Sequence, residues 1–176
     1  MDLTTFDSAL TGRLKMLDGR TFRGIVYTNS VLRTQNDVAD YLLSVNAKCF
    51  ARAGDACYYE GNTVFLLGEG VQDFSGGPLT RSLRMVRANA HLAHSRATAA
   101  VDAVSGLAKA SGGPTNLGTI WCSMLATSKI NDGFHTADSK YALITNDPTV
   151  QVADQIGKYI CTFVQTLHGL TFFEVK

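Results

Sequence analysis

The chain has 176 residues, of which 45% are hydrophobic, and this is enough apolar material for the core of one ordinary domain or of two small ones. Its 16 basic and 15 acidic residues leave a net charge of +1, so the protein as a whole has no positive field that would hold a nucleic-acid backbone. Neither a signal-peptide pattern nor an apolar run of about 18 residues occurs, which gives no support for secretion or for a membrane-spanning segment.

Arginine is concentrated in the first part of the chain. Residues 1–100 contain all nine arginines and two lysines against nine acids, whereas the remainder contains five lysines against six acids. The planar guanidinium group pairs well with carboxylates and phosphates, so this imbalance is compatible with an anionic partner. Scattered surface arginines are the interpretation that we favour.

The cysteines and histidines form no recognisable metal or catalytic pattern. They are Cys49, Cys57, Cys122 and Cys161, with His91, His94, His135 and His168. No C-x-x-C pair occurs, no third ligand accompanies the closely spaced His91 and His94, and no Cys-His nucleophile signature is present. We therefore expect free, mostly buried thiols in a reducing cytosol, no metal, no other cofactor and no enzymatic activity.

The first predicted elements are a short helix and a β-hairpin. Apolar residues at helical spacing predict a helix over residues 3–10. Strand-like runs at 12–16 and 20–27 flank Asp18-Gly19, which is a strong signal for a two-residue hairpin turn. A further strand is predicted at 41–45.

A second hairpin is predicted between residues 54 and 67. Two β-prone runs, 57–60 and 63–67, are separated by Gly61-Asn62. These two residues accept positive φ angles at low cost, which predicts a tight turn.

A looser version of this segment recurs near the C-terminus. Residues 153–164 and 170–176 are strand-like and are separated by Gln-Thr-Leu-His-Gly. A β module used twice is the most economical explanation. Asp55 and Asp154 each open such a segment, where a short carboxylate accepts hydrogen bonds from backbone N–H groups, so we predict turn residues and not an acid/base pair.

A glycine-rich loop is predicted at 68–78, where it would end the preceding strand. It lacks the spacing of a phosphate-binding loop and a following helix. Residues 79–87 alternate imperfectly and predict a strand, with a helix as the competing interpretation. Arg81, Arg84 and Arg87 would divide between the two faces of a strand but would form a stripe on a helix.

The segment from Ala88 to Ala110 is rich in alanine, which predicts a helix over roughly 95–109 that ends at Ser111-Gly112-Gly113-Pro114. The residues after it contain further strand-like runs, at 119–126, 140–145, 159–164 and 170–175.

These elements predict a mainly β protein with one Ala-rich helix, of the α+β class. The predicted organisation is a small β-barrel or sandwich module over 1–94, the Ala-rich helix and a Gly-Gly-Pro linker over 95–116, and a second β-rich module over 117–176.

Two groups of residues are candidates for a subunit interface. Arg81, Arg84 and Arg87 suit solvated or interfacial salt bridges, and as a stripe they could meet nucleic acid or an acidic subunit. Adjacent residues of a strand point to opposite faces, so one of Phe172 and Phe173 must leave the core of its own module. A neighbouring subunit could then cover it.

A succession of short motifs covers roughly residues 6–88. These are the entry segment around Phe6, the hairpin from Asp18 to Val26, the strand 41–45, the Arg52-Ala53-Gly54-Asp55 turn leading into Tyr58-Tyr59-Glu60-Gly61-Asn62-Thr63-Val64-Phe65, a loop with Asp73, and the strand through Leu83-Arg84-Met85-Val86. In this succession the first part of the chain resembles the small β-barrel head-tail joining (head-closure or neck) proteins of tailed bacteriophages.

The resemblance implies a structural virion protein that is not an enzyme. Such a protein would form a homo-oligomeric ring in the neck, would join the capsid portal or its adaptor to the tail components, and would surround DNA without sequence-specific binding. It would have no membrane partner and would be located in the virion after assembly in the host cytoplasm. A ring needs two different contact faces on each subunit.

Three other functions remain as alternatives. The chain could be another phage assembly subunit, such as a tail terminator, tail tube or coat protein. It could be an RNA-binding small barrel, because Asp18-Gly19-Arg20-x-Phe22-x-Gly24 is similar to an Sm-like strand pattern, although the second Sm-like motif is missing. An enzyme is the most distant alternative.

Overall fold

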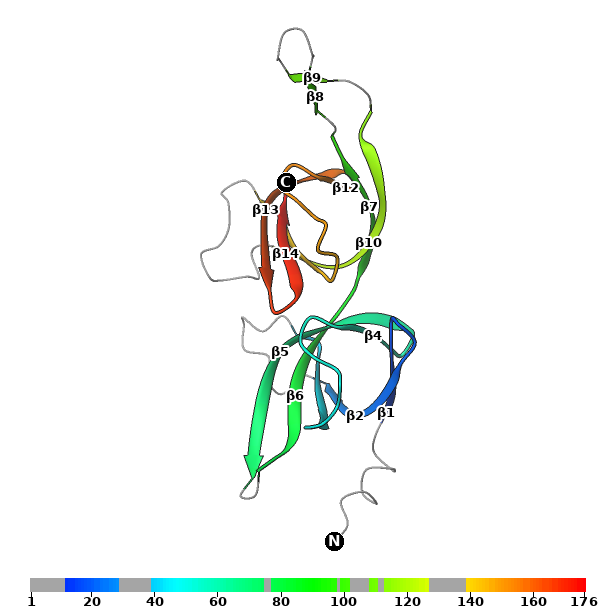
Figure 1. Ribbon diagram of the computed structural model, residues 1–176, viewed down its shortest axis with the longest axis vertical. Helices are drawn as coiled ribbons and strands as arrows, with labels where there is room; N and C mark the ends of the chain where they lie inside the picture. Colours follow the sequence, from blue (N-terminus) through cyan, green and yellow to red (C-terminus); the bar gives the residue numbers. More distant parts are fainter. Residues whose placement is uncertain are drawn as a thin grey trace.

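The computed structural model describes residues 12–28, 39–74, 77–97, 99–101, 108–110, 113–126 and 139–176. These residues form β-strands joined by turns, and no helix occurs among them (Figure 1). The fold is therefore mainly β, as the sequence predicts.

The first six strands close into a barrel. They are β1 (Gly12–Met16), β2 (Thr21–Thr28), β3 (Tyr41–Asn46), β4 (Ala56–Tyr59), β5 (Asn62–Phe74) and β6 (Gly77–Arg87). Neighbouring strands follow the order β1-β2-β3-β6-β5-β4. The barrel closes because β4 returns to β1, where Cys57 lies opposite Met16.

The later strands form a second closed barrel. They are β7 (Ala90–Arg96), β10 (Thr115–Ala126), β11 (Tyr141–Thr145), β12 (Gln155–Ile156), β13 (Tyr159–Leu167) and β14 (Leu170–Val175). Their order is β7-β10-β11-β14-β13-β12, and Ile156 lies opposite His94 where β12 meets β7. Between β7 and β10, β8 (Ala99–Val101) and β9 (Ala108–Ala110) form a separate two-stranded sheet.

The two barrels have the same topology, strand for strand. When β1–β6 are matched to β7 and β10–β14, the strand pairings place Tyr41 at the position of Tyr141 and Leu43 at the position of Leu143. Each of these tyrosines packs edge-to-face against a tyrosine of the following hairpin, with ring centroids 5.3 and 5.4 Å apart. The predicted double use of a β module therefore extends to a whole barrel.

Alternation along the strands fills the two interiors separately. The first core is built from inward residues such as Leu14, Leu43 and Leu83, all fully buried. The second core is built in the same way, and Leu143 and Phe173 are among its most buried members. Each barrel therefore has a hydrophobic interior of its own.

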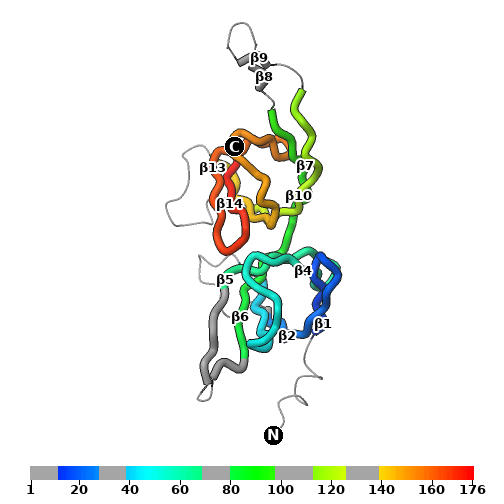
Figure 2. Tube along the Cα trace, in the orientation of Figure 1, coloured from blue at the N-terminus to red at the C-terminus, as the bar shows by residue number. Residues whose placement is uncertain are grey.

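A third apolar cluster joins the barrels and is called the joint here. Its buried members are Ala39, Ala56, Phe65, Leu67, Val86, Ala88, Ile144 and Leu170, with Leu125 and Phe172 packed against them. The chain passes from one barrel to the other between Arg87 and Ala90, and the barrels are stacked along the long axis of the molecule (Figure 2). β7, which lies mostly within the predicted first module, pairs with strands of the second barrel.

Backbone also meets backbone at the joint. Gly54 has φ +96°, and a Cβ atom there would stand 2.5 Å from the carbonyl oxygen of His168 and 2.9 Å from the Cα of Gly169. Those two residues form the turn between β13 and β14. Glycine is required at position 54 because the backbone of the second barrel occupies the place of a side chain.

The predicted Ala-rich helix is wrong over the described part of 95–109. Ser95 and Arg96 end β7, where they pair with Asn116 and Thr115 of β10, and the alanines at 99, 100, 108 and 110 belong to β8 and β9. Alanine has the highest intrinsic helix propensity, but the preference amounts to less than about 1 kcal/mol per residue, and tertiary pairing of the kind seen in β7 overrides it.

Two details of the predicted loops are also wrong. Residues 68–74 and 77–78, expected as a loop, belong to β5 and β6, and register shifts near Leu67 and Gln72 accommodate the extra residues. The tight turn of the β4–β5 hairpin was expected at Gly61-Asn62. It is formed by Glu60 and Gly61, both with positive φ, because Tyr59 pairs with Asn62.

The predicted hairpin over 12–27 is confirmed, with a three-residue loop, Leu17–Gly19, instead of the two-residue turn. The strands predicted within 41–45, 79–87, 119–126, 140–145, 159–164 and 170–175 are confirmed as well. The helix predicted over 3–10 lies outside the described residues.

Replacing Gly54 by alanine should weaken the joint. We expect Gly54→Ala to lower the free energy of unfolding by clearly more than the about 1–2 kcal/mol of a left-handed alanine alone, because the added methyl meets backbone that cannot rotate away. Urea unfolding, followed by far-UV circular dichroism and by fluorescence of the single tryptophan in the second barrel, measures this loss.

Gly61→Ala is the matched control. Gly61 has φ +77°, but no atom lies within 4 Å of the place that an added methyl would take, so this variant carries the backbone strain without the contact. Equal losses in the two variants would show that the approach of the two backbones does not stabilise the molecule.

Candidate functional site: the outer faces of the two barrels

Three cations share the outer face of the β1–β2 hairpin and are called the basic face. Arg13, Lys15 and Arg23 are exposed, because alternation turns Leu14 and Phe22 into the barrel. Arg13 lies directly opposite Arg23, and Lys15 lies opposite Thr21 on one side and Tyr58 on the other. The barrel therefore gathers three positive charges from two adjacent strands.

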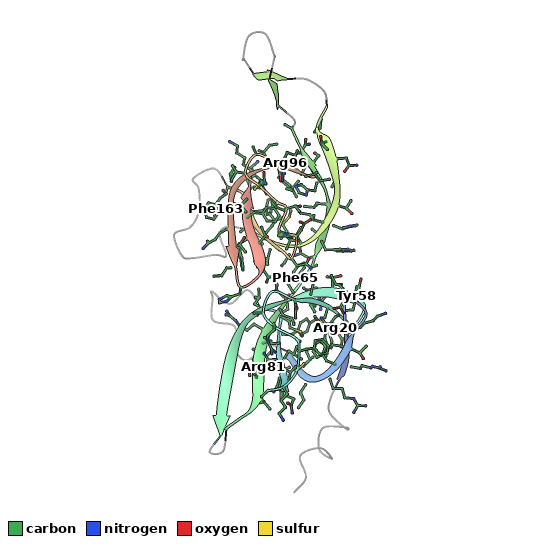
Figure 3. All side chains as sticks on the ribbon, viewed as in Figure 1. Arg20, Tyr58, Phe65, Arg81, Arg96 and Phe163 are labelled. Atoms are coloured by element: carbon green, nitrogen blue, oxygen red, sulfur yellow. The ribbon has the colours of Figure 1, made fainter. Side chains whose placement is uncertain are left out.

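No acid balances these charges among the described residues. Arg13 donates a hydrogen bond to Thr21 Oγ1 at 3.2 Å, and the nearby Asp18 pairs with Arg20 at 2.7 Å. The backbone N–H and the guanidinium of Arg20 hold the pKa of Asp18 below its usual value. Arg20 and Tyr58 are labelled in Figure 3 on the side of the first barrel that carries β1.

The matching face of the second barrel is aromatic. The positions of Arg13 and Arg23 are taken by His91 and Trp121, which also lie directly opposite each other. Their rings stack with centroids 4.2 Å apart and an interplanar angle of 11°. Trp121 is 48% exposed, so this pair, called the aromatic face, is open to a partner.

A carboxylate at the far end of the second barrel is buried and fully used. Asp154 is 1% exposed and accepts hydrogen bonds from His94 Nε2 at 2.8 Å, from Arg96 Nε at 2.6 Å and from the backbone N–H of Gln151 at 2.8 Å. Burial alone would raise the pKa of Asp154, but these donors outweigh it and hold the pKa well below its usual range. Arg96 is labelled in Figure 3.

The matching turn of the first barrel has the same backbone geometry. Asp55 accepts from the N–H of Arg52 at 2.8 Å, as Asp154 does from Gln151. Each turn also makes the same pair of backbone hydrogen bonds, to Leu66 of β5 in the first barrel and to Cys161 of β13 in the second. Asp55 has no histidine partner, because Met16 stands where the second barrel has His94. Both aspartates are turn residues, as the sequence predicts.

The three arginines of the predicted interface lie on β6 and do not form a stripe. Arg81 is 7% exposed, and its guanidinium donates to the carbonyl oxygens of Cys49 at 2.5 Å and Ala51 at 2.9 Å. Arg84 is exposed on the outer side of the strand. Arg87 is exposed, hydrogen-bonds to the Tyr41 hydroxyl and lies over its ring. Alternation along β6 therefore places Arg84 on the face opposite to that of Arg81 and Arg87.

The two predicted interface phenylalanines also separate. Phe173 is 1% exposed in the second core, and Phe172, on the opposite face of β14, is half-buried against the joint. Part of the cover sought from a neighbouring subunit is supplied by the first barrel of the same chain. Phe65, labelled in Figure 3, lies on the first-barrel side of this contact.

Three of the four free thiols, Cys57, Cys122 and Cys161, are buried, and Cys49 is half-buried. Burial raises the pKa of Cys57 to about 12, of Cys122 to about 12 and of Cys161 to about 11, so little thiolate forms at neutral pH. Within the part of the chain that the structure describes, no three metal-binding side chains come together. No helix among the described residues is long and apolar enough to cross a membrane.

Comparison with known proteins gives no match: no protein-family model, no curated protein and no solved structure is significantly similar to this chain.

Neither outer face was predicted from the sequence. The signal for the basic face was present, since Arg13 and Lys15 on one side of the turn and Arg23 on the other alternate with apolar residues. The aromatic face left no such signal, because His91 and Trp121 are 30 residues apart and only the β7–β10 pairing brings them together.

Replacing Asp154 by asparagine tests the buried network. We expect Asp154→Asn to lower the free energy of unfolding by about 1.5–3 kcal/mol at pH 7, since one of the two buried acceptor oxygens that His94, Arg96 and Gln151 use becomes an NH2 group. Asp55→Asn, which changes only a turn acceptor, should cost about 1 kcal/mol.

The pH dependence has a definite sign. The pKa of Asp154 is lower in the folded protein than the about 3.9 of an unfolded chain, so its stabilisation is complete above that pH and is lost as the pH falls further. The free energy of unfolding, measured in urea at pH 7 and at pH 3, should change less between the two pH values in Asp154→Asn than in the wild type. An unchanged difference would contradict the assigned role.

Proposed function

We propose that the chain is a structural subunit of a tailed-bacteriophage virion, and that it forms a homo-oligomeric ring in the neck, between the capsid portal and the tail. The observation that carries the proposal is the tandem repeat of one closed barrel with chemically different outer faces. A ring of identical subunits needs two different contact faces on each copy, and the repeated barrel provides distinct faces on one rigid frame.

Barrel closure supports a subunit that assembles through side chains. In both barrels the first and last strands of the order are paired, so each sheet closes on itself. A closed barrel presents mainly outward side chains to a neighbour, and outward tryptophan and arginine are typical anchors of protein interfaces. Trp121 and Arg84, both exposed, are the residues that we assign to subunit contacts.

The buried side chains of Arg81 and Asp154 hold loops of the protein itself in place, which also favours a structural role. Arg81 fastens the loop at Cys49 and Ala51, and Asp154 fastens the turn at Gln151. The proposed partners are further copies of the chain, the portal or its adaptor, tail components, and DNA that passes through the ring. The proposed location is the virion, and the protein is not an enzyme.

Negative-stain microscopy combined with mass measurement of the purified chain tests the proposal. We expect closed rings with one defined number of copies. Open tubes would favour a tail-tube subunit in place of a neck ring. A monomer that retains single-stranded RNA at moderate salt would overturn the virion function.

Two single variants locate the contacts in these rings. Trp121→Ala and Arg84→Ala should each shift the mass from ring to smaller species, with an unchanged circular dichroism spectrum. Val152→Ala is the matched control, because Val152 is 59% exposed on a turn away from the aromatic face and its loss should leave the rings intact. Rings that survive both variants would remove these residues from the interface.

A further inference from the structure

We propose that the basic face, formed by Arg13, Lys15 and Arg23, is a contact site for the phosphate backbone of duplex DNA. This inference rests on the proposed function, in which DNA passes through the ring, and it names the surface that meets the DNA. Three observations support it: two of the like charges are placed opposite each other, the fold does not need them, and no acid pairs with them among the described residues.

The placement of the cations costs stability in the free protein. Arg13 and Arg23 are direct cross-strand neighbours, and like charges in that position destabilise a hairpin. Lys15 stands on the same face two residues along β1, about 7 Å away. Thr21 Oγ1 accepts one hydrogen bond from Arg13 but brings no negative charge. An external anion would relieve this repulsion.

The second barrel shows that the fold does not require cations here. The positions of Arg13, Lys15 and Arg23 correspond to those of His91, Ala93 and Trp121. Even the neighbouring threonine is the same, because Thr21 corresponds to Thr119. The same topology therefore carries three lysine or arginine side chains at these positions in the first barrel and no lysine or arginine there in the second.

A phosphate backbone suits this surface better than an acidic face of a second copy. At the described surface Asp18 is already paired with Arg20, and Asp40 and Asp147 lie on separate segments, where they accept from the N–H groups of Arg87 and Thr149. The guanidinium fork binds phosphate in a bidentate manner, and lysine binds it as a point charge. The net charge of +1 excludes binding by the whole protein, but not by a local group of three cations.

Fluorescence anisotropy of a labelled DNA duplex, titrated with the full-length protein over a range of salt concentrations, tests the inference. Three phosphate contacts predict that log K falls with log salt with a slope of about −2.7 for each subunit bound. The triple variant Arg13→Gln/Lys15→Gln/Arg23→Gln should bind at least tenfold more weakly, and its slope should be reduced by about one unit for each cation removed.

Two further variants separate local charge from net charge and from folding. Lys48→Gln/Lys158→Gln/Lys176→Gln removes the same charge elsewhere and should change the affinity less than twofold. Arg13→His/Lys15→Ala/Arg23→Trp copies the matching face of the second barrel, so it should keep the fold while binding is lost. Equal losses in the basic-face and control triple variants would overturn the inference.

Mass measurement of the same samples distinguishes this inference from the proposed function. Wild-type rings that do not bind the duplex would overturn the inference and leave the ring intact, and the basic face would then suit an acidic protein partner. Duplex binding that depends on the basic face in a protein that forms no rings would support the inference and overturn the ring. Tenfold tighter binding of single-stranded RNA than of duplex would overturn the inference in favour of an RNA-binding barrel.

Discussion

The apolar joint between the two barrels is the contact on which the rest of the molecule depends. Alternation places Val64 and Leu66 inside the first barrel and Phe65 and Leu67 outside it, yet all four are buried. The outer pair is covered by residues such as Leu170 of the second barrel. Burying a phenylalanine of this kind stabilises the folded state by about 2–3 kcal/mol. The joint therefore fixes the orientation of the first barrel relative to the second, and with it the relative positions of their outer faces.

The same aspartate turn serves two purposes in the two barrels. In the first, Gly54 before Asp55 abuts the backbone of Gly169, so the turn forms part of the joint. In the second, the matching residue is Ala153, which also has positive φ but is exposed, so a side chain is accommodated. Asp154 fastens that turn to β7 through His94 and Arg96.

Short-range chemistry made part of this fold predictable. The hairpin at Asp18-Gly19 and the turn roles of Asp55 and Asp154 depend on a few adjacent residues, and all three predictions are confirmed. The helix prediction failed because strand pairing outweighs the helix preference of alanine: the end of β7 pairs with β10, and β8 pairs with β9.

The repeat of the barrel was only partly visible in the sequence. Tyr41 and Tyr141 match, as do Thr21 and Thr119, but outward positions such as Arg23 and Trp121 differ, and His94 even replaces Met16 inside the barrel. The joint left one readable signal. Residues 63–67 are buried without interruption, which is typical of a strand covered on both faces, but the sequence alone does not show what covers the second face.

The basic face lies on strands that the joint does not use. No residue of β1, β2 or β7 contributes to the joint among the described residues, whereas β4, β5, β6, β11 and β14 all do. The basic face and His91 of the aromatic face therefore lie on strands whose outer side carries no packing duty toward the other barrel. A partner bound at the basic face does not compete with the contact that holds the barrels together. The outward residues of β1 and β2 can differ from those of β7 and β10 because only the inward residues of these strands pack in the barrel cores.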